Sequence, residues 1–121
     1  MQIEYPITFL YYTDLDPVVP FYRDVLGLDL QIDQGWAKIF RLNDRAYVGL
    51  VDESRGSMTA TGGEGVLLTL VVEDVDAWYR HMRDNGVTIV TPPTTHEDIG
   101  VYCFFAEDPG GYRIEIQKFL D

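Results

Sequence analysis

The stretch that decides the fold runs from Asp14 to Leu28 and reads DLDPVVPFYRDVLGL. Sixty residues downstream, the stretch from Asp74 to Val87 reads DVDAWYRHMRDNGV. An acidic start, an Arg-Asp pair and a glycine near the end recur in both, at nearly the same spacing. Self-similarity at a fixed offset is typical of a duplicated structural unit. We therefore predict that the chain consists of two similar halves.

Both copies carry the spacing of an amphipathic helix. Apolar residues recur at i, i+3, i+4 and i+7, counted from Leu15 in the first copy and from Val75 in the second. The aspartates that open each copy are natural N-caps, and Gly27 and Gly86 suit a left-handed C-cap. Two prolines in the first copy must lie in its first helical turn or just before it.

Short segments rich in β-branched and aromatic residues complete each half. One precedes each helix and three follow it, with turn residues at 43–44 and 108–111. The predicted strands are Ile7–Thr13, Asp29–Ile32, Trp36–Leu42 and Ala46–Val51, then Leu67–Glu73, Thr88–Val90, Val101–Ala106 and Tyr112–Phe119. Each half is therefore predicted to be a strand–helix–strand–strand–strand unit.

The two halves are expected to form a single domain over residues 1–121. We place module one at about 5–52, a linker rich in Gly, Ser and Thr at about 53–64, and module two at about 65–120. A unit of roughly 50 residues does not bury both faces of its sheet alone, so the modules should pair. The predicted fold class is α+β, with two paired βαβββ modules whose curved mixed sheets surround a shared cup.

Composition excludes several partners. The chain has 9 Lys and Arg against 20 Asp and Glu, a formal charge of −11, which argues against a nucleic-acid partner. The basic residues are scattered, and no apolar stretch approaches the roughly 18 residues of a membrane span, so no membrane partner is expected. The N-terminal residues lack the basic region of a secretory signal, and we expect a cytoplasmic protein. The single cysteine, Cys103, excludes an intrachain disulfide.

Two motifs make the sequence resemble the vicinal oxygen chelate superfamily, which includes glyoxalase I, extradiol dioxygenases and bleomycin-resistance proteins. The first is Asp14-Leu15 followed by FYRDVLGL at 21–28, and the second is EDPGGYRIE at 107–115. The resemblance covers essentially the whole chain. It implies paired βαβββ modules, usually in homodimers, with a ligand site inside the cup.

Metal-dependent members of the superfamily place four ligands on the inner face, one each from the first and last strands of each module. The resemblance maps these positions to Ile7, Gly49, Leu67 and Glu115, and a one-residue shift of the fifth strand gives Leu68. Only Glu115 has a ligand atom in its side chain. A divalent ion held by one carboxylate lacks the ligands that such ions require. We therefore expect no metal ion and no other cofactor.

Alternation along the strands predicts which side chains point into the cup. The expected ligand-binding residues are Phe9, Tyr11, Trp36, Phe40, Tyr47, Gly49, Thr69, Arg113, Glu115 and Gln117. Aromatic walls with a few polar groups are typical of small-molecule sites. At Gly49 the missing side chain leaves a vacancy that suits an organic ligand.

The sequence pattern is weaker for the aromatic residues, whose side of the sheet must be inferred from their neighbours. Trp36 and Phe40 are assigned to the cup because Ala37 and Ile39, between them, look like helix-packed residues. Tyr102 and Phe104 occupy the matching strand of the second half. They either line the cup or pack on the helix.

Glu115 is the strongest candidate for chemistry. In an apolar cup its carboxylate would serve as a general base or as a hydrogen-bond acceptor for a ligand. The alternative is a family relic that is neutralised by Arg113 or another nearby base and does no chemistry. His81 is expected on the solvated surface, His96 in a polar loop at 94–100, and Cys103 as a buried structural thiol.

Three functions follow from these residues. The leading hypothesis is metal-independent binding of a small, partly aromatic organic molecule by a homodimer, in one version sequestration as in the bleomycin-resistance branch that the chain resembles. That branch binds basic drugs, and the negative charge would attract a cationic ligand. The second is a metal-free isomerase or lyase with Glu115 as catalytic base and Tyr11 or Tyr47 as donor. The third is metal-dependent glyoxalase or dioxygenase chemistry with another ligand set, such as Glu115 with His96.

Overall fold

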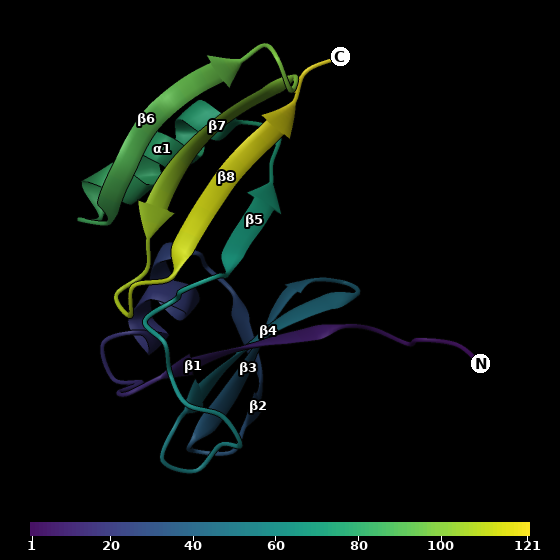
Figure 1. Cartoon of the computed structure of the whole chain (residues 1–121), viewed down its shortest axis with the longest axis vertical. Coiled ribbons are helices and arrows are strands. Elements are labelled where there is room, and N and C mark those ends of the chain that lie inside the picture. Colours follow the sequence, from purple (N-terminus) through teal and green to yellow (C-terminus); the bar gives the residue numbers. More distant parts are fainter. The chain divides into compact units, whose positions relative to one another are not determined.

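The computed structural model describes residues 1–121, and its contacts divide the chain into two compact units, Met1–Gly63 and Glu64–Asp121. Each unit contains one four-stranded mixed sheet (Figure 1). The order of elements in each is the strand–helix–strand–strand–strand order that the repeat predicts. No helix of the chain combines the length and the apolar character needed to cross a membrane.

The strands of the first unit follow the prediction to within one residue at each end. The elements are β1 (Ile7–Tyr12), a short helix η1 (Phe21–Val25), β2 (Asp29–Asp33), β3 (Ala37–Asn43) and β4 (Ala46–Asp52). The sheet order is β1-β4-β3-β2. The β1–β4 pair is parallel and the other pairs are antiparallel, because β1 reaches β4 only through the crossover that contains the helix.

The first helix is shorter and wider than the predicted amphipathic helix, which is a correction to the sequence analysis. Its regular part is a π-helix in which the backbone N–H of Leu26 donates to the carbonyl of Phe21, 2.9 Å away. Pro17 and Pro20 have no N–H to donate, so a regular α-helix does not start at the aspartates. The predicted apolar stripe is nevertheless buried, with Val18 fully covered.

The second unit also contains five elements. These are β5 (Leu67–Val71), α1 (Val75–Asp84), β6 (Thr88–His96), β7 (Val101–Glu107) and β8 (Arg113–Phe119). The sheet order is β5-β8-β7-β6, and α1 covers one face of this sheet (Figure 1). The parallel β5–β8 pair repeats the β1–β4 pair of the first unit. The duplication in the sequence is therefore a duplication of topology.

Strand β6 is six residues longer than the predicted Thr88–Val90. It continues through Pro92 and Pro93 to His96, and its register against β7 shifts twice. Proline is tolerated here because β6 is an edge strand, where a missing N–H need not cost a ladder hydrogen bond. The prediction of a polar loop at 94–100 is therefore wrong at its start, and His96 ends a strand.

The caps of the second helix agree with the prediction. The carboxylate of Asp74 accepts a hydrogen bond from the backbone N–H of Ala77, at 2.9 Å. The helix ends at Asp84, and Gly86, just past the C-cap, has a φ of +73°, the left-handed conformation that glycine adopts without strain. Gly27, at the equivalent place in the first unit, has φ +70°. Both helices therefore end as the repeat predicts.

The turn between β7 and β8 is built around a buried carboxylate. Asp108 is 4% exposed, and its Oδ1 accepts hydrogen bonds from the backbone N–H groups of Gly110 and Tyr112, both at 2.9 Å. The same residue pairs through its backbone with Tyr112. The turn thus fixes the register of the strand that carries Glu115.

We expect Asp108→Ala to lower the free energy of unfolding by about 1–2 kcal/mol, because it leaves two turn N–H groups without their acceptor. Asp108→Asn keeps an oxygen at the same place and is the matched control, with a smaller loss. Urea unfolding measured on the three proteins checks this. Equal losses in both variants would show that the charge, and not the acceptor, stabilises the turn.

Candidate functional site

Four of the predicted site residues share the face of the first sheet that lies opposite its helix, called here the first open face. Register pairs Phe9 with Gly49 and Ile7 with Tyr47, so these side chains alternate with the buried Leu10 and Tyr12. Tyr12 points to the helix side, where its hydroxyl lies 3.2 Å from that of Tyr22. Tyr11 belongs to the open face by the same alternation.

The predicted vacancy at Gly49 is filled. A Cβ placed on Gly49 would lie 2.4 Å from Cδ1 and 2.5 Å from Cε1 of Phe9. The phenyl ring therefore lies directly over the glycine backbone, across the parallel β1–β4 pair. The expectation that this position leaves space for a ligand is wrong, because the neighbouring strand supplies a ring that covers it.

Tyr11 is covered in part by the segment that follows β4. Its hydroxyl lies 3.2 Å from Oγ of Ser57, and the backbone N–H of Ser57 donates to it at 3.3 Å. A Cβ on Gly56 would lie 2.6 Å from Cε2 of Tyr11 and 2.7 Å from a methyl of Val51. The stretch predicted as a linker thus begins as a strap packed on the first open face, and glycine is required for that close approach.

Phe40 does not belong to the first open face, and this placement was predicted wrongly. Register pairs Ile39 with Gly49 and Phe40 with Val48, so Ile39 shares the open face and Phe40 lies on the helix side. There Phe40 is fully buried, with its ring centroid 6.4 Å from that of Tyr22.

Trp36 also differs from the prediction. It precedes β3, its carbonyl accepts from the N–H of Asp52 at 2.8 Å, and the guanidinium of Arg55 lies 5.9 Å from its ring centroid. The Trp36 ring therefore forms a cation–π contact with Arg55. Arg55 follows β4 and belongs to the same segment that covers Tyr11.

The second sheet brings its four predicted site residues onto one face, the second open face. Register pairs Thr69 with Glu115 and places Arg113 and Gln117 two residues away on the same side of β8. Glu115 is 9% exposed and Gln117 is 8% exposed. The hydroxyl of Thr69 donates to Oε1 of Glu115 at 2.8 Å. This carboxylate is the best-defined polar group of the predicted set.

Arg113 does not neutralise Glu115. Its guanidinium lies 3.7 Å from a carboxylate oxygen of Glu107, its antiparallel neighbour on β7, and it is largely exposed. No Lys, Arg or His nitrogen of the chain lies within ion-pair distance of Glu115. Neutralisation of Glu115 by Arg113 is therefore not what the structure shows, and whether Glu115 takes part in chemistry stays a prediction.

Cys103 lies on the second open face beside Glu115. It pairs in register with Gln117 and is 2% exposed, which confirms the predicted buried thiol. Burial, together with the nearby Glu115 carboxylate, raises the pKa of the thiol to about 11. The thiol is therefore neutral at physiological pH.

We expect Cys103 to react with iodoacetamide at pH 8 at least about tenfold more slowly in the folded protein than in urea, since only the thiolate is the nucleophile. Mass spectrometry of timed samples measures both rates. Cys103 is the single cysteine, so no other thiol contributes to the measured alkylation. Equal rates in the folded and unfolded protein would contradict the assigned environment.

Tyr102 and its neighbour Phe104 pack on the helix, which settles the question left open for them. The Tyr102 hydroxyl donates to Oδ1 of Asp76 on α1 at 2.5 Å, and this bond raises the pKa of the hydroxyl. Phe104 is fully buried, with its ring centroid 5.4 Å from that of Tyr79. Neither side chain belongs to the second open face.

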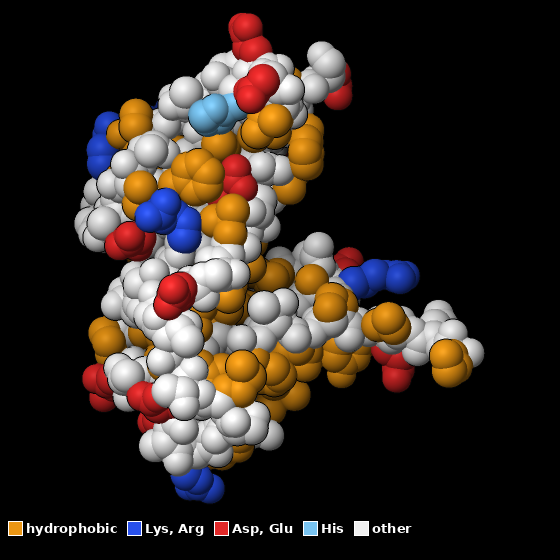
Figure 2. All heavy atoms as spheres, viewed as in Figure 1, with side chains coloured by type: hydrophobic (Ala, Val, Ile, Leu, Met, Phe, Trp, Pro, Cys, Tyr) orange, Lys and Arg blue, Asp and Glu red, His pale blue; other side chains and the backbone are white.

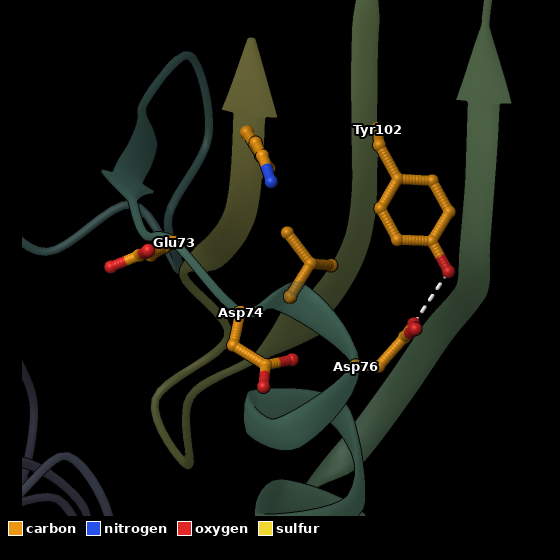
Figure 3. A pocket seen from close by; sticks show the side chains of 6 residues that line it. Glu73, Asp74, Asp76 and Tyr102 are labelled. Carbon is orange, nitrogen blue, oxygen red and sulfur yellow. Dashed lines mark hydrogen bonds between the residues drawn. The ribbon is translucent and has the colours of Figure 1, made fainter. Parts of the chain in front are cut away.

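The structure also shows a hollow that sequence reasoning missed. It has a volume of about 580 Å³, opens to solvent at the start of α1, and is lined by Glu73, Asp74, Val75, Asp76, Tyr102 and Lys118. Figure 3 shows Asp76 pointing to Tyr102, while the carboxylate of Glu73 points away from them. Asp74 caps the helix and Asp76 holds Tyr102, so two of the three carboxylates have structural partners.

The histidines do not join a metal centre with Glu115. His81 is exposed on α1, as predicted, with its ring 6.0 Å from that of Trp78. His96 lies two strands away from β8, opposite Phe119, which follows Glu115 by four residues. The usual strand spacing and rise then separate His96 and Glu115 by about 16 Å. That separation is too large for one ion. The chain contains no cluster of three or more His, Cys, Asp or Glu side chains suited to a metal.

Comparison with known proteins decides the family. The model of the Glyoxalase/Bleomycin resistance protein/Dioxygenase superfamily matches residues 5–116. The chain belongs to this superfamily. Its topology of two βαβββ units is the architecture expected from the resemblance of the sequence motifs.

Relatives of the chain carry different descriptions. It is 29% identical over 117 residues to the uncharacterized protein YraH of Bacillus subtilis, covering 88% of this chain and 91% of that protein. It is 30% identical over 115 residues to a probable lactoylglutathione lyase of Synechocystis, covering 85% and 86%. A superfamily crystal structure from Nocardioides matches with a TM-score of 0.81 at 20% identity, over 100% of this chain and 86% of the other. The last similarity is one of fold.

Proposed function

We propose that this superfamily member works without a metal ion and binds a small, partly aromatic organic molecule, with sequestration as its role. The observation that carries the proposal is the ring of Phe9 lying over Gly49, beside Ile7 on the same strand. Metal-dependent members would need ligand atoms at positions 7 and 49. This chain instead presents ring and alkyl surface there, which suits an apolar ligand.

We propose that the ligand-binding residues lie on the open faces of the two sheets. The first open face contributes Phe9, Tyr11, Tyr47 and Gly49, and the second contributes Thr69, Arg113, Glu115 and Gln117. Phe40 leaves the proposed site because it is buried on the helix side of the first sheet, whereas Trp36 stays a proposed ligand-binding residue beside Arg55.

We propose that the protein is a homodimer in the cytoplasm. Large apolar side chains are exposed on both open faces, including Phe9 at 46%, Val71 at 61% and Phe119 at 59%. Figure 2 shows hydrophobic side chains on the surface of each unit, with acidic side chains scattered between them. A partner copy would cover such surface. Light scattering after size exclusion tests this, and a monomer at micromolar concentration would contradict it.

Native mass spectrometry of the purified protein tests the main proposal. It reports the dimer mass, any bound metal and any retained small molecule in one measurement. We expect no stoichiometric metal, and no lactoylglutathione lyase activity after addition of Zn²⁺, Ni²⁺ or Mn²⁺. Tightly bound metal whose removal by a chelator abolishes an activity would overturn the proposal and support lactoylglutathione lyase activity, the activity named for the Synechocystis relative.

One observation favours a second candidate function, a metal-free isomerase or lyase. In its own unit the Glu115 carboxylate accepts a hydrogen bond from a neutral donor, the hydroxyl of Thr69, and Arg113 pairs with Glu107 instead, as a proton-accepting base requires. Tyr47 is the better candidate for a hydrogen-bond donor to substrate than Tyr11, because the strap at Ser57 already contacts Tyr11.

Glu115→Gln separates the two candidate functions. If the protein only binds its ligand, we expect retention to weaken by about tenfold, the effect of one charged hydrogen bond. If it is an enzyme, we expect turnover to fall by a factor of at least about 100 while the ligand is still bound. The measurements are ligand retention in native mass spectrometry and isomer analysis of the released molecule. Unchanged retention and unchanged chemistry would exclude Glu115 from either role.

A further inference from the structure

Glu115 lacks a counter-charge in its own unit. It lies on β8 between β5 and β7, and its side chain is 9% exposed. The nearest basic residue along the strand, Arg113, pairs with Glu107 instead. Lys118 lies on the helix side, among the residues that line the hollow beside α1. A carboxylate removed from water is costly unless it is paired and hydrogen-bonded, and here only a hydrogen bond is present.

The one donor that contacts Glu115 within its unit holds it in place without neutralising it. The hydroxyl of Thr69, on the neighbouring strand β5, donates to Oε1 at 2.8 Å. On the other side of β8, the thiol of Cys103 lies on the same face, in register with Gln117. A carboxylate accepts up to about four hydrogen bonds, so one donor leaves room for a ligand.

Gln117 is the second polar group of this site. It follows Glu115 by two residues on the same face of β8, about 6.6 Å along the strand. Gln117 is 8% exposed. Its side-chain amide makes no hydrogen bond within the chain. No side-chain polar atom of the chain is both fully buried and unpaired, so this amide keeps access to solvent. An amide that has no partner in the protein and is reached by solvent can form hydrogen bonds with a ligand.

The remaining neighbours are apolar. Phe105 pairs in register with Glu115 on one side, and Val71 pairs with Gln117 on the other. Val71 is 61% exposed, so the edge of this surface is open to an incoming molecule. Aromatic and alkyl surface flanking a carboxylate and an amide suits a flat cation better than a small hydrated ion.

From this arrangement we infer that Glu115 and Gln117 form a recognition site for a planar cationic group carrying N–H donors, of the aryl amidine or aryl guanidine class. The cationic N–H groups donate to Glu115, and the Gln117 amide takes the adjacent polar group of the same molecule. The inference rests on the proposed function, because it names the chemical class of the ligand that the open faces bind. The formal charge of −11 attracts such a molecule at long range.

Benzamidine is the test probe, with benzamide as its neutral, nearly isosteric control. Titrations of the full-length protein by calorimetry or by ligand-detected NMR give both affinities. We expect benzamidine to bind at least tenfold more tightly than benzamide, and Glu115→Gln to remove that difference while benzamide binding is unchanged. Gln117→Ala is expected to weaken both probes about threefold. Glu107→Gln is the matched control, because this carboxylate shares the face but pairs with Arg113, and it should leave benzamidine binding unchanged.

Amide NMR of the wild-type protein keeps the inference testable if Glu115→Gln fails to fold. Shifts caused by benzamidine must then concentrate on residues 69–71, 103–105 and 115–117. Equal affinities for the two probes, or shifts elsewhere, would overturn the cation site but leave the proposed aromatic binding intact. Absence of binding by either probe also overturns the inference. Native mass spectrometry then decides separately whether the proposed function fails with it, through retained metal.

Discussion

Replacing Phe40 by alanine is expected to lower the free energy of unfolding by about 3–5 kcal/mol, the usual cost of removing a fully buried phenyl ring. The ring is 0% exposed and lies on the helix side of the first sheet, against Tyr22. A typical domain has only about 5–15 kcal/mol to lose, so the variant is expected to be marginal at 37 °C.

Phe9→Ala is the matched control for this prediction. Phe9 lies in the same sheet but on the other face and is 46% exposed, so its removal is expected to cost no more than about half as much. Urea unfolding at 25 °C measures both changes, and Phe40→Leu supplies a milder variant if the alanine variant does not fold. Ligand retention should change with Phe9 and not with Phe40. The reverse pattern would show that Phe40, as the sequence analysis expected, faces the ligand.

Gly49→Ala is expected to destabilise the protein by about 1–3 kcal/mol, because its new methyl group must displace the ring of Phe9. The methyl carbon would lie 2.4 Å from the nearest ring atom, well inside contact distance. The backbone of Gly49 is not in the left-handed region, so alanine causes no conformational strain at this position. The whole penalty is therefore assigned to a single pair of side chains on neighbouring strands.

In a Phe9→Ala background, Gly49→Ala should raise the free energy of unfolding instead of lowering it. Without the ring, alanine in the interior of a strand is better than glycine by about 0.5–1 kcal/mol, because glycine loses more backbone freedom on folding. A double-mutant cycle built from four urea-unfolding curves measures the coupling between positions 9 and 49. Coupling near zero would mean that the ring does not lie over the glycine. The space would then be free for a ligand, as the sequence analysis expected.

Much of the fold could be predicted because its signals are local. The helix stripes, the glycines that end them and the turn at Asp108 each depend on a few neighbouring residues. The strands of the first unit were therefore placed to within one residue. Prediction failed where prolines interrupt a pattern that otherwise favours a helix or a strand. Pro17 and Pro20 sit inside a helical pattern, and Pro92 and Pro93 sit inside an edge strand.

The candidate site was predictable only in part, for the same reason. On β8 the alternation is clean, with apolar Ile114 and Ile116 on one side and polar Glu115 and Gln117 on the other. Their common face follows from the sequence. On β3 two apolar residues, Ile39 and Phe40, stand side by side, so a period of two cannot say which of them faces the helix. The choice made from the sequence was the wrong one.

The sequence by itself determined the duplication, the order of elements in each unit, the superfamily and the absence of ligand atoms at positions 7, 49 and 67. Only the tertiary structure decided that Phe9 fills the space over Gly49, that Phe40 is buried under the helix, and that Glu115 accepts a hydrogen bond from Thr69 while Arg113 pairs with Glu107. The physical reason is register. Which side chains meet across two strands depends on how those strands pair, and this pairing is set by packing between segments distant in the sequence.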